Sequence, residues 1–275
     1  MNDRVTNDHA TRGLSRALGV LIHLGGLAAF AYPFLLPAHE RTETSSHAQD
    51  APVLFAALAL LLIGVALSEM RAHRLDAKHV ALLGVLAAVN AVLRVPGSLG
   101  GASLMFFLPI VCGYVFGARF GFLLGATSFA ASAAITGGIG PWLPFQMWGL
   151  GWVGAGAGVL RMVTRGRAPV LVLACYGWIA GMLFGALLNL WFWPFQGGAT
   201  ALSWYPGLGF AAALRHYWRF YLVTSLAWDS LRAIGNVVLV AVLGRPVLRL
   251  LERFRARSLV TWDDASPARP VASPV

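Results

Sequence analysis

The amino-acid sequence predicts an all-α fold, a polytopic membrane helix bundle of eight transmembrane helices. Hydrophobic residues make up 58% of the chain and charged residues 12%, whereas about a quarter of the residues in a soluble domain are charged. The mean hydropathy of +0.69 also indicates that much of the chain lies in lipid. The apolar residues are gathered into separate runs, and a bilayer core of about 30 Å needs roughly 20 such residues per helix.

Eight apolar runs approach the length that a membrane-spanning helix requires. They cover residues 17–36, 53–70, 79–95, 103–117, 120–136, 144–160, 169–193 and 220–243. The first run is too long for the apolar part of a signal peptide and has no small-residue cleavage site after it, so we expect it to remain as a helix. Only Ala118 and Arg119 separate the fourth run from the fifth, and Gly117 and Gly121 favour a tight turn there.

The residue composition of these runs predicts how the chain is organised. The first two runs are aliphatic, whereas the other six carry the tryptophans and most polar residues. We therefore expect an appended two-helix hairpin and a six-helix core, and a long outer loop at 194–216 that is too interrupted by glycine and proline to span the bilayer. The predicted segments are a cytoplasmic arm (1–16), the transmembrane hairpin (17–78), the core (79–244), a basic cytoplasmic helix (245–262) and a disordered tail (263–275).

The basic residues predict the orientation of the bundle. They fall on the same side of an eight-helix zigzag, which the positive-inside rule makes cytoplasmic, so both termini are expected inside the cell. The net charge of +10 is therefore a topological signal, and the sequence does not indicate nucleic-acid binding. The residues concerned are Arg4, Arg12, Arg16, Arg71, Arg74, Lys78, Arg119, Arg161, Arg165, Arg167, Arg245, Arg249, Arg253, Arg255 and Arg257.

Four polar residues share one face of the last predicted helix. Ser225, Asp229, Arg232 and Asn236 follow one another at steps of four, three and four residues. Counted from the start of the run at residue 220, Asp229 lies near the middle of the membrane, where a charge must face protein or water. Arg232 is its obvious partner. The pair is either a structural ion pair, a ligand contact or a switch that changes partners.

The third run carries Asn90 and Arg94 on one face of its outer half. Arg94 either extends to the membrane surface or points inward, where we expect it to meet Gln146 and Asn189. Aromatic residues of the outer segments would complete a pocket that stacks a flat ring, although they could equally form an interfacial belt. These residues are Trp142, Trp148, Trp191, Trp193, Trp204 and Tyr205.

Small residues mark two further features. The stretch 137–158 combines glycine, proline and tryptophan, and we interpret it as an extracellular turn that leads into a helix with room for close packing. On the third run, Gly84 with Ala88 and Ala87 with Ala91 are small residues four apart, which would let another helix approach closely.

The sequence offers little for catalysis or for a cofactor. It has no HExxH, CxxC, nucleophile elbow or P-loop, and its seven histidines are scattered. Cys112 and Cys175 lie in apolar runs and are expected to be core residues. We therefore expect neither a metal nor a cofactor, and any nucleotide-driven step would need a separate subunit.

Two stretches resemble a known family. The sequence GYVFGARFGFLLGATSFAASAAITGGIGPWLPFQMWGLGWVGAGAG from Gly113, and WDSLRAIGN from Trp228, are similar to the substrate-binding S component of energy-coupling factor (ECF) transporters, the vitamin-uptake branch of ABC transport. The resemblance covers roughly residues 80–257, and GPWLPFQM is its most specific part.

This resemblance implies a substrate-binding subunit of the bacterial plasma membrane that captures a vitamin or related micronutrient from outside. Such a subunit is not an enzyme and has no ATPase of its own. It docks on a membrane scaffold subunit and two ATPases and topples in the bilayer. Its docking motif would fall on Ala87 and Ala91 or on Gly84 and Ala88, and the extra hairpin departs from the usual six helices. Binding residues differ between vitamins, so none is carried over.

Two other functions remain as alternatives from the residues alone. One is a polytopic enzyme that acts on a lipid or isoprenoid with Asp229 as its acid or base, but the scarcity of acidic residues in the core argues against it. The other is a channel or secondary carrier, which usually shows inverted repeats, and no clear repeat is found.

Overall fold

The computed structural model describes residues 2–35, 50–71, 77–94, 103–164, 168–196 and 200–259. Within these residues all regular structure is helical. The α-helices are α1 (Asn2–Ala31), α2 (Ala51–Arg71), α3 (Ala77–Leu93), α4 (Phe107–Phe116), α5 (Ala118–Thr136), α6 (Leu143–Thr164), α7 (Pro169–Phe192), α8 (Phe210–Thr224) and α9 (Leu226–Leu259). Short 3-10 helices are η1 (Tyr32–Leu35), η5 (Leu104–Phe106) and η6 (Trp193–Phe195).

The helices confirm a multi-pass membrane protein. Among the described residues, five helical segments are long and apolar enough to cross a membrane, and two more, over α3 and over η5 with α4, are apolar but shorter. The second to seventh predicted runs coincide with α2 to α7 to within a few residues. Hydrophobic run length therefore located these helices well.

The two ends of the chain differ from the prediction. Helix α1 begins at Asn2 instead of near residue 17. The expected loop at 194–216 already contains the start of α8 at Phe210, and the chain leaves helical geometry at Ser225, whose φ is −125°. The last helix therefore begins at Leu226 and not at 220, and it continues through the segment expected to be a separate basic helix. At 34 residues it is about 50 Å long, well beyond a bilayer core.

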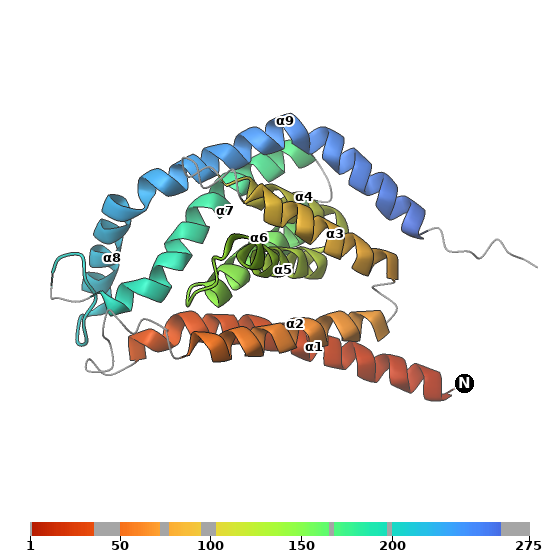
Figure 1. Ribbon diagram of the computed structural model, residues 1–275, viewed down its shortest axis with the longest axis horizontal. Coiled ribbons are helices and arrows are strands. Elements are labelled where there is room, and N and C mark those ends of the chain that lie inside the picture. The colour runs from red at the N-terminus through yellow and green to blue at the C-terminus, as the bar shows by residue number, and fades with distance from the viewer. Residues whose placement is uncertain are drawn as a thin grey trace, which may run out of the picture.

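The helices form an arch over the central pair α5 and α6, and the hairpin of α1 and α2 lies on the opposite side of that pair (Figure 1). Helices α7 and α9 run side by side and form the arch, and α3 packs on α5 beneath it. Helix α4 is buried from Phe107 to Val115, between α5, α6 and α9. Helices α1 and α2 lie together as a hairpin against α6.

Three glycines bring α4, α5 and α6 into backbone contact. A Cβ atom at Gly121 of α5 would overlap the carbonyl of Gly154 on α6 and would lie 2.7 Å from the Cα of Gly113 on α4. No side chain fits at this crossing, which is how small residues let membrane helices approach. Gly117, with φ of +101°, makes the predicted tight turn between α4 and α5, a conformation that favours glycine.

The hairpin is joined to α6 through two indoles. Trp148 Nε1 donates a hydrogen bond to the carbonyl of Ile22 at 3.0 Å, and Trp152 Nε1 donates to His23 Nδ1 at 2.9 Å. Gly26 of α1 makes room for both rings, since a Cβ there would lie 2.7 Å from each of them. The donors of both tryptophans are thus used within the protein, where lipid offers no acceptor.

Candidate functional site

A buried carboxylate lies in the seam between α7 and α9. Asp229 is 2% exposed and forms an ion pair with Arg232, one turn further along α9. It lies in the first turn of α9, because that helix begins at Leu226, and the positive end of the helix dipole favours a carboxylate there. Asp229 therefore lies close to the start of its helix, and not about nine residues into it as the sequence predicted.

Glycines of α7 create the space for these polar groups. Gly177, Gly181 and Gly185 follow at steps of four and face α9. A Cβ at Gly185 would overlap the carboxylate of Asp229, and one at Gly181 would lie 3.1 Å from Asn236 Nδ2. That amide donates to the carbonyl of Gly177 at 3.0 Å. The sequence shows these glycines four residues apart on the seventh run, which indicates a close helix contact. Only the structure identifies α9 as the helix that they contact.

The same seam continues to the end of α7. Asn189 Nδ2 donates to Ser225 Oγ at 2.7 Å, where α8 ends and α9 begins. Ser225, Asp229 and Asn236 thus all contact α7, and Arg232 Nη1 donates to the carbonyl of Gly181 at 3.3 Å. The expectation that these four residues share one face of the helix agrees with these contacts.

Two arginines from different helices lie over one group of aromatic rings. The Cζ atom of Arg94 lies 5.0 Å from the ring centre of Phe129 on α5. The Cζ atom of Arg232 lies 5.3 Å from the ring centre of Phe184 on α7 and 5.7 Å from that of Phe106. Both guanidinium groups are therefore within reach of a cation–π interaction.

The rings themselves are in contact, so they join the two arginine positions. Phe129 and Phe184 are stacked with ring centres 6.1 Å apart, and Phe106 meets Phe184 edge-on at 4.8 Å. We call Phe106, Phe129 and Phe184 the aromatic platform. Arg94 also donates to Ser132 Oγ of α5 at 3.3 Å, so its side chain points toward α5. Sequence analysis missed the platform, because a phenylalanine in an apolar run carries no signal of the face it occupies.

Two side chains on α3 and α6 have buried polar atoms with no hydrogen-bond partner among the described residues. Asn90, which is 0% exposed and one turn before Arg94, leaves both its Oδ1 and its Nδ2 without a partner. Gln146 Oε1 is likewise buried without a hydrogen-bond partner. Gln146 lies one turn before Gly149 on α6, and a Cβ at Gly149 would lie 2.8 Å from the ring of Phe184. Buried polar groups are normally hydrogen-bonded, so these atoms are candidates for contact with a ligand.

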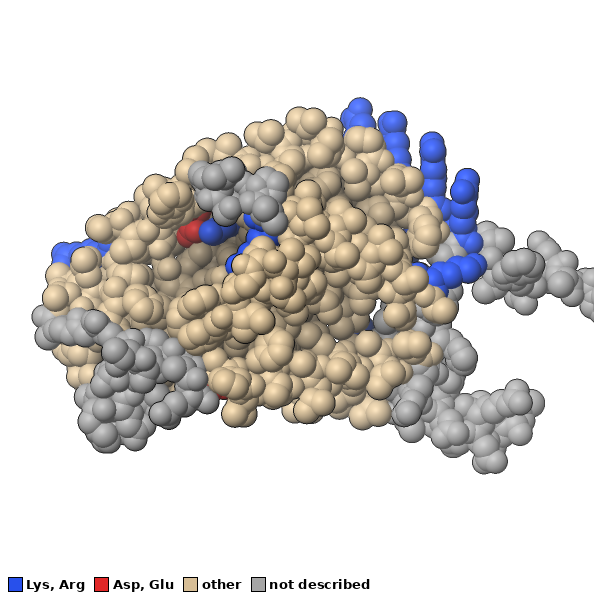
Figure 2. Space-filling model, viewed as in Figure 1, with Lys and Arg blue, Asp and Glu red and all other residues tan. Residues whose placement is uncertain are grey.

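All these residues lie at one end of the bundle. Arg94 follows the last residue of α3, Ser132 belongs to the end of α5, Asn189 to the end of α7, and Asp229 to the start of α9. Figure 2 shows acidic and basic side chains together in a hollow on one face of the molecule. A row of exposed arginines projects at the opposite end, over the end of α9: Arg245, Arg249, Arg253 and Arg257.

The predicted aromatic pocket is not assembled as one site. Trp148 is turned toward the hairpin, and Trp142 is 38% exposed at the start of α6. Trp193 and Trp204 pack around Phe34, with ring centres 6.1 and 5.4 Å from it, and Tyr205 packs against His216 at 6.3 Å. We call Arg94, Arg232, Asp229, Asn90 and the aromatic platform the arginine site. The structure divides the predicted residues between this site, the hairpin contact and a separate cluster at the ends of α1 and α7.

A family model described as ECF transporter, substrate-specific component matches residues 78–244. The chain belongs to this family. No curated protein and no solved structure matches the chain. The protein is thus an S component, a transport binding protein of the membrane and not an enzyme. The match begins just after the hairpin and includes every residue of the arginine site.

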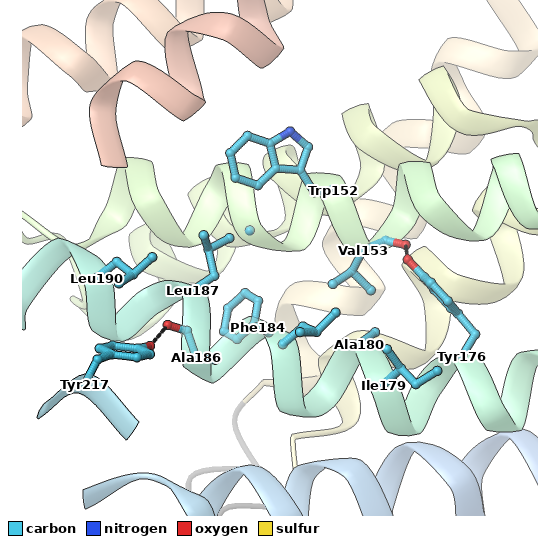
Figure 3. A pocket seen from close by; sticks show the side chains of 12 residues that line it. Trp152, Val153, Tyr176, Ile179, Ala180, Phe184, Ala186, Leu187, Leu190 and Tyr217 are labelled. Atoms are coloured by element: carbon cyan, nitrogen blue, oxygen red, sulfur yellow. Dashed lines mark hydrogen bonds between the residues drawn. The ribbon is translucent and has the colours of Figure 1, made fainter. Parts of the chain in front are cut away.

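Among its described residues the S component also has two apolar cavities, the first of which shares Phe184 with the aromatic platform. One, of about 460 Å³, lies between α6, α7 and Tyr217 of α8 (Figure 3). Its two phenols are already used, because Tyr176 donates to the carbonyl of Val153 and Tyr217 to that of Ala186. The other, of about 490 Å³, lies between the start of α2, the end of α5 and the start of α6. Neither offers polar groups to orient a ligand.

The small residues of α3 divide into two sets in this S component. Ala87 and Ala91 are buried, at 6% and 0% exposure, on the side where α3 packs against α5. Gly84 and Ala88 are exposed, and a Cβ at Gly84 would meet nothing within 4 Å. Of the two pairs that the sequence offered for docking, only Gly84 and Ala88 lie on the outer surface of the chain.

Proposed function

We propose that this S component captures a vitamin or related micronutrient and passes it into the cell with a separate scaffold subunit and ATPases. The observation that carries the proposal is the arginine site. Arg94 and Arg232 lie over the aromatic platform, Asp229 is paired with Arg232, and the unpartnered Asn90 lies one turn before Arg94, all within the part of the chain that matches the family. A few convergent polar groups over an apolar surface are typical of a small-molecule site.

We also propose the orientation that lets the ligand enter from outside. The chain crosses the membrane eight times, with α1 and α2 as the hairpin and α3, α4, α5, α6, α7 and α9 as the core, and with α8 outside the set of spans. The exposed arginines near the end of α9 then lie in the cytoplasm, as the positive-inside rule requires. The ends of α3, α5 and α7 and the start of α9 face outward, and with them the arginine site.

Docking on the scaffold is assigned to the exposed face of α3. Gly84 and Ala88 leave a shallow, smooth strip there, which lets a second helix approach closely. The hairpin lies against α6 and leaves this strip of α3 uncovered among the described residues.

Transport assays test the proposal directly. Cells that lack their own uptake system would express this chain alone, with a scaffold and ATPases, or with ATPases whose Walker-A lysine is changed to alanine. We expect accumulation of a radiolabelled vitamin only with the active ATPases, and specific binding of that vitamin to the purified chain. Equal accumulation by the chain alone would show a self-sufficient carrier and overturn the proposal.

A further inference from the structure

The two arginines of the site also indicate the chemical class of the ligand. We propose that it carries an anionic oxygen group, a carboxylate or a phosphate, which Arg94 and Arg232 bind together. This inference rests on the proposed function, because it concerns the same hollow. It narrows the candidates from any vitamin-like molecule to those with an acid group.

The charges of the site do not balance without a ligand. Arg94 and Arg232 contribute two positive charges, and Asp229 contributes one negative charge through its ion pair with Arg232. Arg94 has no carboxylate within ion-pair distance among the described residues; its contacts are the hydroxyl of Ser132 and the ring of Phe129. The site therefore holds one positive charge more than it neutralises.

An excess charge in a membrane-embedded site is unfavourable, and an anion relieves it. A charged side chain away from water requires a partner of opposite sign. Guanidinium groups suit carboxylate and phosphate, because their planar N–H groups bind two oxygens at once. Among the described residues Arg232 donates from its Nη1 to Asp229 and to the carbonyl of Gly181, so its other N–H groups can bind a ligand. A cationic ligand would meet repulsion at the same place.

The rest of the site suits an uncharged, flat remainder of the ligand. Asn90 lies one turn before Arg94 on α3, and its unpartnered amide is the nearest polar group along that helix for a ligand held by Arg94. Its free donor and acceptor match the polar edge of a heterocycle. The stacked rings of Phe129 and Phe184 supply an apolar surface beside it.

Matched pairs of acidic and neutral compounds test the inference on the purified full-length chain. The probes are nicotinate and nicotinamide, biotin and biotinamide, pantothenate and pantothenol, and pyridoxal phosphate and pyridoxal, with thiamine as a cation. Binding is measured by calorimetry, and any compound that stays bound during purification is identified by mass spectrometry. We expect the bound compound to be an acid, with an affinity at least tenfold above that of its neutral partner. The first three pairs report a carboxylate, and the fourth reports a phosphate.

Substitution of Arg94 links the preference to this residue. In Arg94→Gln we expect a tenfold or greater loss of affinity for the acid, no change for its neutral partner, and partial recovery in Arg94→Lys. Arg219→Gln, on the exposed surface of α8, is the matched control and should bind like the wild type. Thermal unfolding of each variant shows that the fold is retained.

The outcomes separate this inference from the function on which it rests. Tight binding of a neutral or cationic compound, or equal losses for acid and neutral compounds in Arg94→Gln, overturns the anionic ligand and leaves ligand capture intact. A chain that retains and binds no compound, and that supports no ATPase-dependent uptake, overturns both.

Discussion

Gly185 of α7 and Asp229 of α9 are packed so closely that a Cβ atom at residue 185 would overlap both oxygens of the carboxylate. The acid occupies the space that a side chain of α7 would otherwise fill. A missing methyl group on one helix thus makes it possible to bury an acid on the next, together with its partner Arg232.

Gly185→Ala tests this contact. The added methyl group would force the seam apart, and we expect the free energy of unfolding to fall by roughly 1–3 kcal/mol, with a loss of ligand affinity. Thermal unfolding in detergent measures the first effect. Gly19→Ala on α1 is the control, since its Cβ meets nothing within 4 Å. Equal melting temperatures for the two variants would show that the seam is looser than described.

The ion pair can be examined by a double-mutant cycle. Asp229→Asn or Arg232→Gln alone leaves one buried charge without its partner, which typically costs about 3–5 kcal/mol. We expect the double variant to lose less stability than the sum of the two single variants. Unfolding by denaturant measures all four proteins. Strictly additive losses would mean that the two side chains act independently.

Two neighbouring glycines of α1 probe the hairpin contact. Gly26→Ala places a methyl group 2.7 Å from atoms of Trp148 and Trp152, so we expect a lower melting temperature. In Gly25→Ala the nearest atom is 4.0 Å away, and no loss is expected. If both variants melt alike, the indoles do not hold the hairpin in the observed position.

The two faces of α3 predict opposite effects of adding bulk. Ala88→Leu, on the exposed face, should leave the melting temperature of the lone subunit unchanged and weaken its co-purification with the scaffold and ATPases. Ala91→Leu, at a fully buried position, should destabilise the subunit itself. Ala241→Leu, exposed on α9, is the control for added bulk elsewhere. Normal assembly of Ala88→Leu would move the docking face away from this strip.

Run length and composition were enough to predict the all-helical fold and the positions of α2 to α7, whereas the family was predicted from the resemblance of two stretches of the sequence. They failed where helix formation does not depend on a long apolar run. Helix α8 mixes aromatic with basic residues, such as Arg215 and Arg219, so most of it was assigned to a loop. The break at Ser225 was also missed, because serine is tolerated inside helices and only the backbone reveals the interruption.

The candidate site was predictable only in part, for a physical reason. A charged or amide side chain in an apolar run must avoid lipid, so Asn90, Arg94, Asp229 and Arg232 could be selected from the sequence alone. Tryptophan is stable against lipid, protein or the membrane surface, and its type does not fix its direction. Trp148 therefore looked like a pocket residue, although its N–H is bound to the hairpin.

The meeting of Gly113, Gly121 and Gly154 has a mechanical consequence. Main chains in direct contact have no side chains between them that could change rotamer, so α4, α5 and α6 resist sliding and hinge motion at that crossing. Any opening that admits or releases a cargo molecule must then come from the surrounding helices α3, α7 and α9, while the glycine crossing acts as their fixed pivot.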